Sequence, residues 1–582
     1  MKKIFSSIQI LFLLMITATS CNDLLDTKPL DKYDEETVWN DKGLAQLFIY
    51  NSYQTILKEY IQNPLELPNF YGAGSDDYSD NMVVEEKIAT DLNRNILTAD
   101  KDCGWDKFAL IRQANVIIEK AQASVGIADA EKKEMVAQGK MLRAMVYFKA
   151  TKMFGRYIII DKVLTPQDEL NIPQSKTIKE VYDFIISDLK AAAADLNVTA
   201  PNGHLTKGAA LAMLSEVALQ AASYAESGAD GYYQVAKTTC EELFAMGKYD
   251  LDPEYRKLFN DYSYAGGSKE LIFAMWRSKD VTQFKFTPVM KLYPNGEKSK
   301  IPAEAFPKYK DDFLGWGNRW PSQDLVNEYE VIDEDGVAKK WNETSYYKNF
   351  KSGTDYVSDM MYKNRDARFY ASIAYDSTKL GNNMVLTRVK GSSNVKETTK
   401  GKYTLRTNTG YWLRKCITDE AFVTANAYTD YHHVMFRLGR VYLNYAEALY
   451  RLNDLAGAVE YINKTRTTHG QLPALAAGLS KDEVWKAYKS ERRVELFMEQ
   501  DRYWSLLRWY KADGQDMIPE LNHGNDYYEI ADDGKSYKKK AIPVKTNMVN
   551  NTRVWDKRKY LLPVPLKHIN LSEGVLTQNP GW

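Results

Sequence analysis

Helix-length segments with one apolar face recur through most of the sequence, and they come in neighbouring pairs. In residues 105–123 the apolar positions share one face at helical spacing: Phe108, Ile111, Ala114 and Ile118. The next segment repeats the pattern with Met135, Leu142, Val146 and Met153, and Gly155 follows as a helix stop. Further helices are predicted at residues 178–195, 207–225, 232–246, 434–452, 455–467 and 481–510.

One pair of these segments has the spacing of a tetratricopeptide unit, in which small residues let two antiparallel helices approach closely. The positions that carry it are Tyr442, Tyr445, Ala446, Leu449, Ala458, Ile462 and Thr465, with Asn453 and Asp454 at the turn. A generic helix hairpin would show similar spacing. Between residues 247 and 431 helical periodicity fails over most of the length, and tight hairpin turns are predicted at 333–336 and 532–535. The predicted fold is mainly α, with tetratricopeptide-like helix hairpins as a scaffold and a long loop-rich insert that carries short strands.

Composition narrows the function by exclusion. The 582 residues contain 77 basic and 77 acidic side chains, so the chain lacks the overall positive field of nucleic-acid binders, and no nucleic-acid partner is expected. Tyr and Trp are abundant, at 40 and 12 residues. These rings combine an apolar face with a polar edge and favour a binding surface, although they could equally fill helix seams.

The N-terminus predicts export. Lys2 and Lys3 precede an apolar run over residues 10–16, and small residues lead into Cys21, which predicts a signal peptide at 1–20. Cys21 is the predicted lipid anchor and 21–40 a lipidated tether, with plain secretion as the alternative. Three further cysteines, an odd number at wide spacing, argue against a disulfide framework and against a zinc site: Cys103, Cys240 and Cys416.

The search for catalytic motifs finds no phosphate loop, dinucleotide fingerprint, nucleophile elbow or zinc helix, so no enzyme activity, metal or cofactor is expected. A carboxylate pair for glycoside hydrolysis stays open, because only the separation in space identifies one. His432 and His433 are interpreted as structural. On the predicted helix 481–510, Glu491, Glu495 and Arg502 share a face with apolar residues, which predicts a structural ion-pair network.

Short motifs in a fixed order give the chain a family resemblance. They are Cys-Asn-Asp-Leu-Leu-Asp at 21–26, Leu-Arg-Ala at 142–144, Thr-Lys-Gly-Ala-Ala at 206–210, Pro-Ser-Gln-Asp-Leu-Val at 321–326, Tyr-Ala-Glu-Ala-Leu at 445–449, Glu-Arg-Arg-Val-Glu-Leu at 491–496 and Gln-Asn-Pro-Gly-Trp at 578–582. Together they resemble the SusD/RagB family of outer-membrane nutrient-binding lipoproteins of the Bacteroidetes. Gln500 departs from the pattern, because a glycine is common there.

The resemblance implies a non-catalytic protein, anchored by lipid at the surface of the outer membrane. It would bind oligosaccharide or polysaccharide and deliver it to a SusC-like, TonB-dependent barrel. Two alternatives stay open, a peptide-binding RagB-like lipoprotein and, with less support, a secreted glycosidase. The implied regions are an N-terminal helical part at 41–270 and a C-terminal part at 271–582, the latter divided into loop-rich 271–431, helical 432–511 and a tail at 512–582.

The resemblance also implies ligand-binding residues, which would stack on a sugar ring or hydrogen-bond its hydroxyls. Trp316 fits the spacing of the family's sugar-stacking tryptophan best, and Trp320 lies nearby. The remaining candidates are Tyr293, as a second aromatic platform, and four residues of one upstream loop: Tyr71, Asp77, Tyr78 and Asn81. Each ring could instead pack an irregular loop against the helices.

Overall fold

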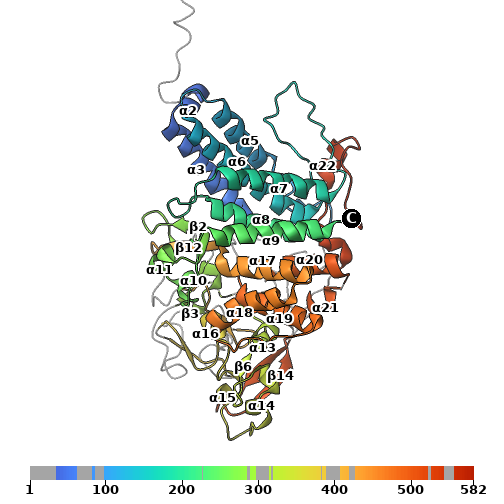
Figure 1. Ribbon diagram of the computed structural model, residues 1–582. Helices are drawn as coiled ribbons and strands as arrows, with labels where there is room; N and C mark the ends of the chain where they lie inside the picture. Colours follow the sequence, from blue (N-terminus) through green and yellow to red (C-terminus); the bar gives the residue numbers. More distant parts are fainter. Residues whose placement is uncertain are drawn as a thin grey trace, which may run out of the picture.

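The computed structural model describes residues 34–61, 81–84, 97–225, 227–284, 287, 289–296, 313–315, 317, 319–381, 383–388, 407–417, 426–514, 516–521, 526–542 and 556–582. Its long helices form a stacked scaffold: α2 (Glu35–Asn40), α3 (Lys42–Ile61), α5 (Phe108–Ala123), α6 (Asp129–Phe154), α7 (Ile178–Asp195), α8 (Lys207–Ala222), α9 (Ala229–Ala245), α17 (Leu438–Arg451), α18 (Leu455–Thr468), α19 (Lys481–Glu495) and α20 (Arg502–Asp513). Figure 1 shows α7, α9, α17 and α18 one above another, and α17 packs on both α8 and α9. The late helices therefore continue the stack that the early helices begin.

Local sequence signals set most helix ends. The Thr177 side chain accepts a hydrogen bond from the Glu180 amide and caps α7, which has the predicted bounds. Gly155, with φ of +72°, ends α6, as predicted. In the predicted tetratricopeptide pair, α17 and α18 pack together across a turn in which Asn453 has φ of +66°. The predicted helical scaffold is confirmed.

Two helix predictions are wrong in part. The segment predicted as one helix at 434–452 begins as strand β12 (Tyr431–Arg437), because its apolar residues pair with β2 (Leu271–Arg277) before α17 starts. The segment 481–510 forms two helices, α19 and α20. Met498 and Gln500 interrupt it with φ of +65° and +58°, and a glycine at the second position would relieve the left-handed backbone.

The rest of the chain is loop-rich and carries short elements. Seven antiparallel strand pairs are described: β1 (Met82–Val84) with β5 (Arg319–Pro321), β2 with β12, β3 (Asn295–Gly296) with β4 (Phe313–Leu314), β6 (Val331–Ile332) with β7 (Ala338–Lys339), β8 (Ile373–Ala374) with β11 (Trp412–Leu413), β9 (Thr378–Leu380) with β10 (Asn383–Val385), and β13 (Asp526–Ile530) with β14 (Tyr537–Ala541). The β6–β7 and β13–β14 hairpins turn where predicted, with φ of +77° at Gly336 and +73° at Gly534. The predicted strand-bearing insert is confirmed.

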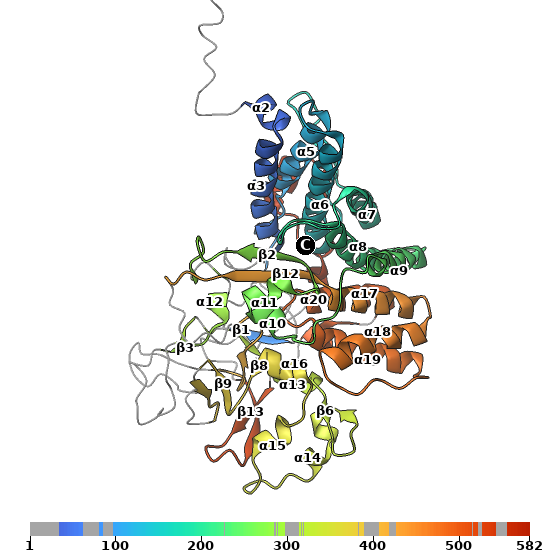
Figure 2. The same cartoon turned by 60° about the vertical axis from the view of Figure 1, so that its left-hand side comes forward.

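Short helices fill the connections. They are α10 (Lys257–Asn260), α11 (Tyr262–Gly267), α12 (Val289–Leu292), α13 (Gln323–Glu328), α14 (Ser345–Lys348), α15 (Val357–Met361), α16 (Ala367–Ser372), α21 (Ile518–Leu521), α22 (Leu566–Leu571) and the 3₁₀ helices η4 (Trp341–Glu343) and η5 (Lys557–Tyr560). Figure 2 shows the β2–β12 pair between the N-terminal helices and the strands of the insert, with α10 and α11 beside it. None of the helices in the described ranges combines the length and apolar character that a membrane crossing requires.

Two large apolar clusters hold the molecule together. The first runs through the helical stack, and the second lies under the insert and includes Trp320, Trp412 and Phe369. Residues at the end of α19 and just beyond it, Val494 and Phe497, belong to the second cluster. The same helix therefore packs in both cores and fixes the insert on the scaffold.

Candidate functional site

The structure gives only a partial view of the predicted ligand-binding residues. Trp316, Tyr71, Asp77 and Tyr78 lie outside the described residues, as does the predicted lipid anchor Cys21. Their roles stay predictions. The other three candidates, Trp320, Tyr293 and Asn81, have defined surroundings.

Trp320 and Asn81 come together at one strand pair. Strand β5 places Trp320 opposite Val83 of β1, and the Asn81 carbonyl accepts a hydrogen bond of 2.8 Å from the Ser322 amide. The Asn81 side chain accepts a second hydrogen bond of 2.7 Å, from Nε of Arg493. Trp320 is 4% exposed and Asn81 is 0% exposed. The segment after the upstream loop and the segment after Trp316 are therefore neighbours in space.

Tyr293 lies just before strand β3 of the β3–β4 pair. It ends the turn after α12 and is 3% exposed, with its ring edge-on to Phe284 at a centroid distance of 5.4 Å. A Cβ at Gly315 would lie 2.2 Å from the Tyr293 carbonyl oxygen, so the chain just before Trp316 touches Tyr293. All three predicted segments thus converge on one part of the insert.

Trp320 and Tyr293 are packed in a core, which is the alternative that the sequence left open for each ring. Trp320 belongs to the second core and lies edge-on to Trp412 at a centroid distance of 6.4 Å, and Tyr293 belongs to the same core. Because both rings are buried in this apolar cluster, their faces are not accessible to solvent. Sequence alone cannot show which side of a short strand meets the core. Neither ring offers a stacking face in this conformation, and their binding roles stay predictions.

A hollow opens next to this region. Phe284, which touches Tyr293, lines a small pocket that shares Asn260, Tyr262, Thr429 and Asp430 with a larger one. The larger one, called the tyrosine hollow below, has a volume of about 690 Å³, within the range of about 300–1,000 Å³ typical of ligand sites. It is lined by Arg256, Lys257, Asn260, Asp261, Tyr262, Ser263, Lys279, Tyr428, Thr429 and Asp430.

Hydrogen bonds between two segments far apart in the sequence build the wall of the tyrosine hollow. The chain beyond β2 runs beside the chain before β12: the Thr429 amide donates to the Thr282 carbonyl at 2.9 Å and the Phe284 amide to the Ala427 carbonyl at 2.8 Å. The Lys279 amide donates to Oδ1 of Asp430 at 2.7 Å. These bonds hold the two segments in fixed register, so the hollow is preformed.

The tyrosine hollow combines aromatic rings with hydrogen-bonding groups. Tyr428 is 60% exposed, and Tyr262 is half-buried with its ring edge-on to Trp276 at 5.0 Å. Burial, followed by the carboxylates of Asp430 and Asp280, raises the pKa of Tyr262, so its hydroxyl stays protonated and can donate. Rings beside carboxylate, amide and hydroxyl groups can stack on a sugar and bind its hydroxyls.

The histidine pair lies behind this wall. His432 stacks on Trp276 at a centroid distance of 5.1 Å, and its Nε2 lies 2.7 Å from the Leu258 carbonyl oxygen. His433 is buried as well, and burial lowers its pKa to about 4. The contacts of His432 are structural, as predicted.

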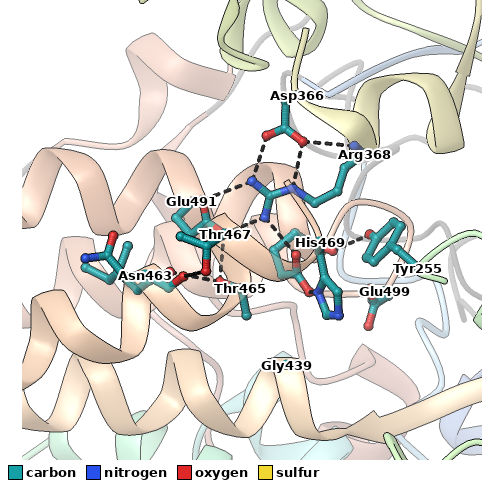
Figure 3. Close-up of polar contacts among 12 residues, drawn as sticks. Tyr255, Asp366, Arg368, Gly439, Asn463, Thr465, Thr467, His469, Glu491 and Glu499 are labelled. Atoms are coloured by element: carbon teal, nitrogen blue, oxygen red, sulfur yellow. Dashed lines mark hydrogen bonds and ion pairs between the residues drawn. The ribbon is translucent and has the colours of Figure 1, made fainter. Parts of the chain in front are cut away.

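A second polar cluster is fully buried and joins the insert to the scaffold (Figure 3). Arg368 of α16 binds both Asp366 oxygens, at 2.9 and 2.7 Å, and Oε2 of Glu495 at 2.7 Å, and it also contacts Glu491. Arg437 binds Glu270 at 2.8 Å and Glu495 at 2.6 Å. The predicted structural ion-pair network is confirmed for Glu491 and Glu495. Arg502 lies beyond the break in the helix and binds Glu520 at 2.7 Å.

Within this network, Glu270, His469 and Glu495 have the residue types of a metal site. However, Nδ1 of His469 lies 2.8 Å from Glu495 and Nε2 lies 3.0 Å from Glu270, so both ring nitrogens serve as donors. Burial alone would lower the pKa of His469, but the Glu270 and Glu495 carboxylates raise it to about 10. A protonated histidine beside Arg437 leaves no lone pair for a metal, and the donor set does not fit one.

Sequence reasoning missed the tyrosine hollow. Its residues come from 256–263, from Lys279 and from 428–430, which only the pairing of β2 with β12 brings together. The available signal was weak: aromatic residues interleaved with Asn, Asp and Ser at 260–264 and at 426–430. Such patterns are also typical of ordinary loops.

Comparison with known proteins agrees with the fold. Residues 269–582 match the family model described as the SusD family, and residues 23–219 match a model described as starch-binding associating with outer membrane. The "SusD-like protein P38" of Formosa agariphila is 26% identical over 549 residues, which cover 88% of this chain and 93% of that protein.

Solved structures give the same result. A SusD-like protein from Bacteroides fragilis superimposes with a TM-score of 0.74 at 25% identity, covering 95% of this chain and 100% of the other. A laminarin-binding SusD-like protein shares the fold with a TM-score of 0.61 at 19% identity, covering 92% and 99%. The model that matches residues 23–219 is thus described by starch binding and by association with the outer membrane, and the last neighbour is named for laminarin binding. Because one family model covers more than half of the sequence, this chain belongs to the SusD family.

Proposed function

We propose that this protein binds oligosaccharide or polysaccharide at the cell surface and delivers it to a SusC-like, TonB-dependent outer-membrane transporter. The observation that carries the binding role is the tyrosine hollow, in which Tyr428 and Tyr262 face a set of polar side chains. Each ring that stacks on a sugar contributes about 0.5–1.5 kcal/mol, by analogy with aromatic pairs. The family's carbohydrate binding and its association with the outer membrane support the proposal.

The anchor and the organisation of the chain complete the proposal. Cys21 carries the lipid after removal of residues 1–20, residues 21–40 tether the body, and 41–270 and 271–582 form its N- and C-terminal regions. The membrane is contacted through the lipid alone. The helical stack, whose apolar residues are buried in the first core, is the side that contacts the transporter. The protein acts by binding and has no catalytic step.

Isothermal titration against laminarin and starch oligosaccharides tests the binding role. A ligand of the tyrosine hollow should lose about 2- to 13-fold in affinity in Tyr428→Ala, which corresponds to the 0.5–1.5 kcal/mol of one stacking ring. Tyr356→Ala is the matched control, because Tyr356 is also exposed but lies at α15, away from the hollow. Equal loss in both variants, or none in either, contradicts the assignment. A peptide that co-purifies with the native complex would show instead that the ligand is a peptide, as in the RagB-like alternative.

A further inference from the structure

A second hollow lies on the scaffold side of the β2–β12 pair. It has a volume of about 350 Å³ and is formed by the loop 199–204, Thr206, Lys248, Tyr249 and parts of 268–276. This "lysine hollow" shares no lining residue with the tyrosine hollow. The size falls at the lower end of the range for small-ligand sites, which suits a single sugar residue.

The charges on its wall are of one sign. Two lysines line it, Lys248 and Lys269, together with His204, whose pKa is lowered by burial. Among the described residues no carboxylate lines it. Lys269 has a partner outside the wall, Asp250 at 3.6 Å, and both side chains are strongly exposed. Lys248 is different, because its ammonium donates to a neutral group, the Val198 carbonyl oxygen, at 2.7 Å. Burial lowers the pKa of Lys248, and its ammonium lies 5.6 Å from the centroid of the Tyr249 ring in the same wall.

The wall is also held in place. A Cβ at Gly208 would lie 2.1 Å from the Tyr249 hydroxyl, so that ring is seated against the first turn of α8. Nδ2 of Asn202 donates to the Gly266 carbonyl at 2.9 Å, which ties the 199–204 loop to α11. Trp276 closes one side, and its far face is stacked on His432. A fixed wall lowers the cost of ordering on binding.

We propose that the lysine hollow is a second ligand site, which binds one sugar residue that carries an anionic group, either a carboxylate or a sulfate ester. Lys248 supplies the charge-assisted hydrogen bond, and the 199–204 loop and Trp276 bound the ring. The start of α8, where Thr206 caps the helix, adds a favourable dipole. This site is separate from the tyrosine hollow and does not depend on the proposed function.

Three matched monosaccharides test it in the intact protein: glucuronate, glucose 6-sulfate and glucose, followed by ligand-observed NMR titration. At least one anionic probe should bind about tenfold or more tightly than glucose, as one charge-assisted hydrogen bond allows. Whichever of the two binds more tightly identifies the anionic group. Lys248→Met, which keeps the aliphatic stem, should abolish the preference, and Ala200→Asp, which adds a carboxylate to the wall, should abolish binding of both anions.

Two control variants make the result specific. Lys190→Met removes an exposed lysine of α7 and should leave binding unchanged. Tyr356→Ala, at the start of α15, should also leave it unchanged, since Tyr356 lines neither hollow. The proposal is overturned if neither anion binds more tightly than glucose, or if Lys248→Met, shown to be folded by circular dichroism, retains the preference. Loss of the preference in Lys190→Met or Tyr356→Ala would also overturn it.

Discussion

Replacing Arg368 with methionine tests the view that buried charges lock the insert onto the scaffold. Arg368 is 0% exposed and sits between Asp366 and the two glutamates of α19, Glu491 and Glu495. Without the guanidinium, Asp366 loses both hydrogen bonds of its bidentate pair with Arg368. Glu491 keeps the hydrogen bond that it accepts from Oγ1 of Thr465 at 2.7 Å. Removing one partner of a buried pair leaves a charge that neither water nor a counter-charge compensates.

The expected loss in the free energy of unfolding is about 3–5 kcal/mol. Equilibrium urea unfolding, followed by tryptophan fluorescence, measures it from the shift of the midpoint at unchanged slope. Arg112→Met is the matched control: Arg112 donates to the Leu164 carbonyl oxygen in an exposed setting, so its loss should cost less than about 1 kcal/mol. A cost below about 1 kcal/mol for Arg368→Met would show that these buried ion pairs do not fix the insert on the scaffold.

Three further changes test other parts of the structure. His469 is held protonated by Glu270 and Glu495, with its pKa raised to about 10 from 6.5, so its contribution is fully present below pH 6.5 and is lost as the pH rises towards 10. The free energy of unfolding of the wild type should therefore fall more steeply with pH than that of His469→Gln over this window, by up to about 1.4 kcal/mol per pH unit. Urea unfolding at a series of pH values measures both, and an equal dependence on pH in the two proteins would contradict this. Trp320→Ala should cost about 3–5 kcal/mol because the ring lies in the second core, and a change of melting temperature within error would show that it does not. Trp316→Ala should weaken glycan binding in calorimetry at unchanged melting temperature, whereas a large thermal destabilisation would place that ring in the core.

Local signals explain how much of the fold the sequence could predict. Helix α7 has its predicted ends because a threonine cap and an apolar stripe both lie within the segment itself. The break at Met498 and Gln500 was not predicted, because it depends on distant residues: Glu499 beyond α19 binds Lys415 at 2.7 Å and Arg437 at 2.9 and 2.7 Å. The family resemblance marked Gln500 as a usual glycine, which a positive φ explains.

The candidate site was harder to predict for the same physical reason. The motifs led to segments that do converge, at β1–β5 and β3–β4, but could not tell a buried ring from an exposed one. Which face of a two- or three-residue strand meets the core is decided by packing partners elsewhere in the chain. The tyrosine hollow requires the pairing of β2 with β12, whose strands are more than 150 residues apart, and no local pattern specifies such a partner.

A crystal structure of the protein with the oligosaccharide that binds most tightly in the titration panel tests the central claim directly. Sugar density is expected in the tyrosine hollow, with one ring stacked on Tyr428 and hydroxyls within hydrogen-bonding distance of Asp261 or Asp430. Sugar bound elsewhere, with the hollow filled only by solvent, would contradict it.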